Sequence, residues 1–175
     1  MAYTSKEKFD SFLLAIETEG LPGLGPEVRS SVQPSAALAR AVDALGLGGA
    51  AAGLVKAAAL LWHDHLDESH TVSQDIGSTD GSFLHGIMHR REPDYPNAKY
   101  WFNRVGTHDA FPDILNRAKA ILTDTSLAHL IKGEWNSFAM VDAVSRAKVD
   151  SKEYALLQQV QAIEAESILR PLFPG

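Results

Sequence analysis

The histidines of this 175-residue chain are unevenly distributed, and their spacing indicates metal chemistry. Six of the seven lie between Trp62 and Asp109, in a stretch that also holds many arginine, carboxylate and aromatic side chains. His85 and His89 are four residues apart in the run HGIMH. On a helix both imidazoles project from one face, about one turn apart, and this spacing allows two histidines to ligate one metal ion. Solvated or hydrogen-bonded histidines would have the same spacing without any metal.

A third ligand is expected from the preceding run LLWHDHLDESH. If residues 50–70 form one helix, a rotation of 100° per residue places His63, Asp67 and His70 on one flank of its apolar stripe. Glu68 falls on the other flank. Two imidazoles and a carboxylate are a typical ligand set for a divalent transition metal such as Zn, Fe, Mn or Ni. The structural alternative is an ordinary polar border of a helix.

Two ligand sets satisfy this spacing equally well. His70 with the HGIMH pair supplies three protein ligands and leaves the open position of a catalytic site. Asp67 then acts as a fourth ligand or orients one of the histidines. In the alternative set, His63 and Asp67 replace His70. Glu68 is then the expected general base, and of the two carboxylates either Glu68 or Asp67 is expected to handle the proton. The polar loop from residue 71 to 82 is expected to border the site.

The residues that follow HGIMH indicate recognition of a small anionic molecule. Arg90, Arg91 and Lys99 are expected to orient the substrate, because cationic side chains, and the planar fork of arginine above all, bind carboxylates and phosphates. Asp94 and Tyr95, in the same segment, complete the predicted substrate-binding set. The structural alternative is a solvated loop held by local ion pairs.

A longer run of unusual residue types surrounds these positions. The sequence SFLHGIMHRREPDYPNAKYWFNRVGTH, preceded by LDESHTVSQDI, resembles a group of uncharacterised, largely bacterial hypothetical proteins with a segment like HGIMHRREPDYxNAKYWFRRVG. The similarity covers about a quarter of the chain, roughly Leu66 to His108. It implies that a shared site lies in this segment and brings no established activity. Asn103 stands where the group has arginine, which weakens the case for a paired arginine beside Arg104.

Composition excludes several classes of protein. A net charge of −6 and a pI near 5.6 argue against nucleic-acid binding, which needs a basic face. The absence of cysteine excludes disulfides, thiolate nucleophiles and zinc sites built on sulfur. No glycine-rich nucleotide-binding or flavin motif occurs. The N-terminus lacks the apolar core of a signal peptide, and the most apolar stretch, residues 50–62, is too short to span a bilayer. We therefore expect a cytoplasmic protein with no membrane or nucleic-acid partner, in which homo-oligomers are an open possibility.

Helical periodicity recurs along the chain, and no window shows the alternation of a strand. We predict a single all-α domain over residues 1–175. It is a bundle of about seven helices with a long irregular insert near residues 71–98. The long helices are expected at residues 5–19, 36–45, 50–70, 111–122, 135–148 and 152–170, with shorter ones near 83–90 and 99–105.

The leading hypothesis is therefore a small metal-binding helical protein. Its ion lies between the helix of residues 50–70 and the HGIMH helix, and it serves a hydrolase or lyase reaction on a small anionic molecule. The alternative is a non-enzymatic ligand-binding or interaction module that uses the histidine and arginine cluster without metal. A third hypothesis is purely structural, with the polar cluster as a buried hydrogen-bonded core.

Overall fold

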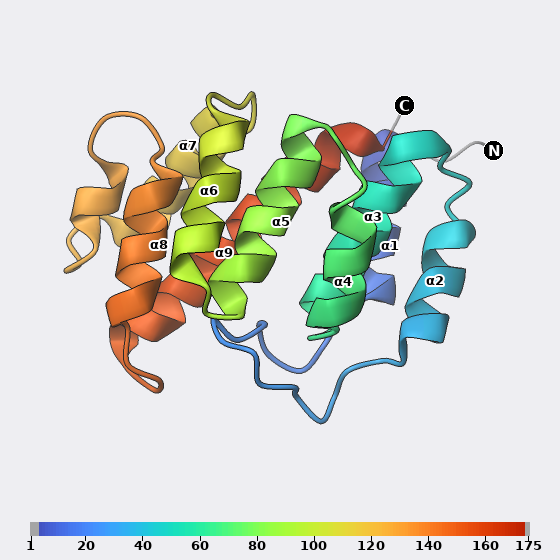
Figure 1. Ribbon diagram of the computed structural model, residues 1–175, viewed down its shortest axis with the longest axis horizontal. Helices are drawn as coiled ribbons and strands as arrows, with labels where there is room; N and C mark the ends of the chain where they lie inside the picture. Colours follow the sequence, from blue (N-terminus) through green and yellow to red (C-terminus); the bar gives the residue numbers. More distant parts are fainter. Residues whose placement is uncertain (1–3, 174–175) are drawn as a thin grey trace.

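The computed structural model describes residues 4–173 and is helical throughout, with no strand in that range (Figure 1). Helices account for 66% of the described residues, which confirms the prediction of an all-α fold. The α-helices are α1 (Ser5–Ala15), α2 (Ser35–Asp43), α3 (Gly49–Trp62), α4 (Leu66–Ser73), α5 (Thr79–Arg91), α6 (Tyr95–Val105), α7 (Phe111–Leu122), α8 (Ser137–Arg146) and α9 (Lys152–Leu169). Two short 3₁₀ helices, η1 (Ala128–Ile131) and η2 (Arg170–Leu172), complete the described elements. None of the helices in this range is long and apolar enough to cross a membrane.

The helix α5 lies at the centre of the molecule. In Figure 1 it stands between α4 on one side and α6 on the other, with α9 crossing behind it. Every residue from Gly81 to Arg91 is buried, so this helix is covered on all sides. Its apolar side chains join the main hydrophobic core, and its polar ones must find partners inside the protein. The two histidines of HGIMH are therefore held in a rigid, packed environment.

The close contact between α5 and α6 depends on a glycine. A Cβ atom on Gly86 would lie 2.8 Å from the ring of Phe102, so any larger residue would push the two helices apart. The short connection between these helices also begins α6 earlier than expected. Asp94 caps the helix by accepting a hydrogen bond from the backbone N–H of Asn97.

The single helix predicted for residues 50–70 is wrong, because the chain breaks between α3 and α4. Asp64 adopts a positive φ of 63° at this break. Its buried carboxylate accepts hydrogen bonds from Arg29 Nε at 2.8 Å and from Arg91 Nη2 at 2.8 Å. Arg91 Nη1 also donates to the carbonyl of Leu61 in the last turn of α3, a carbonyl that accepts from the backbone N–H of Asp64 as well. These contacts stabilise the break, and α4 can turn away from the axis of α3.

The prediction of a long irregular insert near residues 71–98 is also wrong. Only residues 74–78 and 92–94 of that stretch lie outside helices. The polar and glycine-rich sequence there forms a helix start, because the Ser78 hydroxyl accepts a hydrogen bond from the backbone N–H of Gly81 and caps α5. The division of the predicted third helix into α3 and α4 likewise raises the number of helices above the predicted seven.

Candidate metal centre

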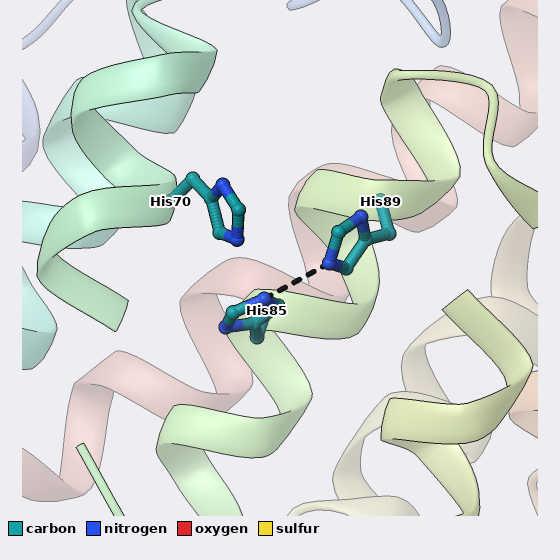
Figure 2. A group of neighbouring side chains, drawn as sticks. All are labelled: His70, His85 and His89. Carbon is teal, nitrogen blue, oxygen red and sulfur yellow. Dashed lines mark hydrogen bonds between the residues drawn. The ribbon is translucent and has the colours of Figure 1, made fainter. Parts of the chain in front are cut away.

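Three histidines from two helices converge at the contact between α4 and α5 (Figure 2). His70 projects from α4 toward His85 and His89, which lie on one face of α5. Each offers one ring nitrogen, and these three nitrogens all lie within 4.8 Å of one another. The centre of the His70 ring is 4.7 Å from that of His85 and 5.2 Å from that of His89. The structure thus brings together the first of the two predicted ligand sets.

The hydrogen bonds of the two α5 histidines point their free nitrogens at each other. His89 Nδ1 lies 2.8 Å from Glu92 Oε2 and donates to this carboxylate, so Nε2 carries a lone pair. His85 Nδ1 lies 3.4 Å from Ser73 Oγ, whose own hydroxyl donates to the carbonyl of His70. When this hydroxyl donates to the carbonyl, His85 donates through Nδ1 and its Nε2 carries a lone pair; when it donates to Nδ1, His85 Nε2 carries the proton. The two Nε2 atoms are 2.9 Å apart, so either a shared proton or a cation ligated by both nitrogens fits between them.

Burial keeps His85 uncharged. His85 is 1% exposed and His89 is 5% exposed, whereas His70 is half-buried and keeps some contact with solvent. Burial, followed by the nearby His89 and His70, lowers the pKa of His85 to about 4. At neutral pH His85 is therefore a neutral imidazole, which is the form that ligates metal ions.

Two side chains that the sequence did not assign to the site hold the histidines in place. Trp101 on α6 stacks on His85, with ring centres 4.0 Å apart and planes 22° apart. Glu92 orients His89 as described above. The Glu92 contact follows from spacing, since residues three apart on a helix are neighbours. The Trp101 contact joins two helices, so no local pattern could predict it.

The alternative ligand set with His63 does not form. His63 is completely buried at the end of α3, away from the cluster. Its Nδ1 accepts a hydrogen bond from the backbone N–H of Gln33 at 3.0 Å, and its Nε2 donates to the carbonyl of Ile16 at 2.8 Å. Burial lowers its pKa. With both nitrogens engaged, His63 fastens the loop before α2 to the end of α3.

The two carboxylates predicted to handle a proton lie on the exposed surface of α4. Asp67 precedes His70 by three residues, so the two side chains lie on the same side of the helix. Glu68 is 200° from His70 around the helix axis at 100° per residue. Its Oε1 lies 3.8 Å from Nδ1 of His65. Among the described residues, neither carboxylate belongs to the group of side chains whose ligand atoms converge, which consists of His70, His85 and His89.

The predicted role of Arg90 and Arg91 in substrate binding is wrong. Both guanidinium groups are fully buried and paired within the protein. Arg90 donates to Glu164 Oε2 at 2.6 Å and to Gln161 Oε1 at 3.3 Å on α9. Arg91 is bonded to Asp64, as described for the break between α3 and α4. The spacing of these residues in the sequence could not reveal partners so far away in the chain.

The other predicted substrate contacts have partners or structural roles of their own within the protein. Lys99 pairs with Asp142 on α8 at 2.6 Å, and Asp94 caps α6. Tyr95 is half-buried, and burial raises the pKa of its hydroxyl. All three cationic side chains of the predicted substrate site, Arg90, Arg91 and Lys99, are thus paired with carboxylates of the protein. The chain matches no protein-family model, no curated protein and no solved structure. The function proposed below is therefore inferred from the geometry of the histidine cluster.

Proposed function

We propose that the protein binds one divalent transition metal ion through His70, His85 and His89. The observation that carries this proposal is the convergence of three imidazoles whose ligand nitrogens all lie within 4.8 Å of one another, with the Nε2 atoms of His85 and His89 2.9 Å apart. The Glu92 carboxylate accepts from Nδ1 of His89, which leaves the Nε2 of this ring free to ligate a cation. His70 supplies the third nitrogen.

The distance between the Nε2 atoms of His85 and His89 also indicates which metal ions fit the site. With metal–nitrogen bonds of about 2.0–2.1 Å, nitrogens 2.9 Å apart subtend an angle of about 90° at the metal. That is the angle between neighbouring positions of an octahedral ion, as with Fe, Mn or Ni. A tetrahedral zinc ion requires about 3.3 Å between nitrogens, which needs only a small shift of one ring.

A hydrolase or lyase reaction fits such a centre. Three histidines leave coordination positions open for water and a substrate, and a bound ion lowers the pKa of its water toward neutrality. His70 is half-buried, and this side of the cluster offers a way in from solvent. Asp67, one turn before His70, is the carboxylate placed to accept a proton. A small anionic substrate would bind the ion itself, since Arg90 and Arg91 are occupied elsewhere.

The alternative of a metal-free anion-binding module has less support. It relied on the arginines that follow HGIMH, and these are paired with Glu164 and Asp64. No other observation favours it over the metal centre.

Elemental analysis of protein prepared without a histidine tag tests the proposal. We expect close to one transition metal ion per chain. The single variants His70→Ala, His85→Ala and His89→Ala should each lose most of it, whereas His129→Ala, at an exposed position on η1, should retain it. Chelator should lower the melting temperature of the native protein and leave that of the three variants unchanged. A metal-free protein that does not bind added Zn, Fe, Mn or Ni would contradict the proposal. Hydrolysis of small esters and phosphates by the metal-loaded native protein, lost on chelation, would support the proposed reaction class.

A further inference from the structure

A second feature of the molecule, away from the histidines, has the properties of a ligand site. An open cavity of about 610 Å³ lies between the end of α6, the start of α7, η1 and the start of α8. In Figure 1 this region is at the α7–α8 end of the molecule, whereas the histidine cluster lies between α4 and α5. The volume is in the range of pockets that bind small organic molecules.

Two residues that line this cavity carry buried hydrogen-bond donors without partners, and these donors lie just beneath its surface. Within residues 4–173, four buried side-chain polar atoms lack a hydrogen-bond partner. Two of these four are Trp135 Nε1 and Ser137 Oγ, and both residues line the cavity. Trp135 is 4% exposed and Ser137 is 7% exposed. Because buried polar groups are nearly always paired, two unpaired donors at one place indicate a partner that the chain itself does not supply.

The polar part of the wall favours an acceptor with a single negative charge. The indole N–H of Trp135 can only donate, and the Ser137 hydroxyl can donate as well. Ser137 is the first residue of α8, a ten-residue helix whose amino end carries a partial positive charge. The Lys132 ammonium lines the same cavity, and the Glu134 carboxylate, which also lines it, disfavours a dianion.

The backbone of α8 contributes little hydrogen bonding to such a ligand. Asn136 Oδ1 already accepts from the backbone N–H groups of Phe138 and Ala139, at 3.0 and 3.1 Å. The apolar part of the wall is formed mainly by aromatic rings, among them Phe102 and Phe111. The cavity therefore combines a ring-lined apolar surface with two side-chain donors and one ammonium group.

We propose that this cavity binds a small aromatic monocarboxylate. Its ring packs against Phe102 and Phe111, and its carboxylate accepts from Trp135 Nε1–H and Ser137 Oγ–H near Lys132. Because both donor atoms are covered, the ligand reaches them after a side chain of the wall turns aside. We expect that side chain to be Phe138, which is 38% exposed. The proposal is independent of the metal centre.

Calorimetry and NMR titration of the full chain test this site, with benzoate, phenylacetate and 3-phenylpropionate as probes. At least one should bind saturably, with chemical-shift changes at the cavity wall. Benzyl alcohol and benzamide, which lack the charge, should bind at least tenfold more weakly. Ser137→Ala and Lys132→Gln should each weaken the carboxylate about tenfold. Ser126→Ala, at an exposed position outside the cavity, should leave binding unchanged.

Ser137→Ala removes a hydroxyl that has no hydrogen-bond partner, so this variant should fold as stably as the native protein. A loss of carboxylate binding in this variant would therefore report on the site and not on unfolding. Trp135→Phe adds a third measurement if its melting temperature is unchanged. Three results would overturn the proposal. One is the absence of saturable binding by all three carboxylates. Another is equal binding of the neutral analogues, and the last is unchanged affinity in both Ser137→Ala and Lys132→Gln.

Discussion

His89 Nδ1 and Glu92 Oε2 lie 2.8 Å apart at the end of α5, so a carboxylate determines which nitrogen of this histidine carries the proton. Glu92 is the C-cap residue of the helix and its side chain is partly exposed. A histidine that donates to a carboxylate through one nitrogen is held in orientation and becomes a more basic ligand through the other. Glu92, which is partly exposed, therefore fixes the orientation of the His89 ring and the direction of its buried Nε2 atom.

Glu92→Ala should therefore weaken metal binding without removing it. We expect the affinity for the ion to fall about 10- to 100-fold, measured by competition with a chromophoric chelator. Glu92→Gln keeps an acceptor oxygen and should lose less. Glu68→Gln, on the exposed face of α4, is the matched control and should bind metal like the native protein. Native affinity in Glu92→Ala would show that this carboxylate does not support the ion.

Gly86→Ala should destabilise the protein, because the added methyl group would lie 2.8 Å from the Phe102 ring and force α5 and α6 apart. Overpacking of this kind costs about 1–3 kcal/mol of the free energy of unfolding, measurable by urea denaturation. The same shift should loosen the stacking of Trp101 on His85. Gly77→Ala is the control, because nothing lies within 4 Å of its added atom. Equal stability of the two variants would contradict this account.

Arg90→Met should unfold more easily while binding metal normally when folded. The substitution leaves the fully buried Glu164 carboxylate without its cation. Loss of one partner of a buried ion pair costs about 3–5 kcal/mol. The double variant Arg90→Met with Glu164→Met should recover much of that stability. A role of Arg90 in substrate binding would instead appear as weaker substrate binding with little change in stability.

The stability of the metal-free protein should fall as the pH is lowered from about 6.5 to about 4. Burial and the neighbouring histidines lower the pKa of His85 to about 4 in the folded state, from an ordinary value of 6.5. The unfolded chain therefore takes up the proton at higher pH, which costs the folded state up to about 3 kcal/mol across this window. Proton competition should release the metal in the same range.

His85→Gln isolates this effect, because the other titrating groups remain in both proteins. Thermal unfolding of the two metal-free proteins should show a shallower decline for the variant between pH 6.5 and 4. His63, whose pKa is also lowered, contributes equally to both curves and cancels in the difference. Parallel curves would show that His85 does not titrate in this window.

The sequence alone was enough to predict the helical class and the paired histidines of α5. Helical periodicity is a local property of the chain, and the i, i+4 spacing of His85 and His89 fixes their common face once the segment is helical. The same reasoning proposed His70 as the third ligand and left His63 as an alternative. The spacing could not determine whether His63 or His70 would face α5.

That choice was made by tertiary contacts. Asp64 meets Arg29 and Arg91 from distant parts of the chain, and these buried pairs stabilise the break that turns α4, with His70, toward α5. Arg90 and Arg91 were predicted to face a substrate because the sequence shows the charge of a side chain and not its partner. The nearest carboxylate to Arg90 in space is 74 positions along the chain, on α9. Ion pairs between distant segments depend on how the helices pack, and no local pattern encodes that packing.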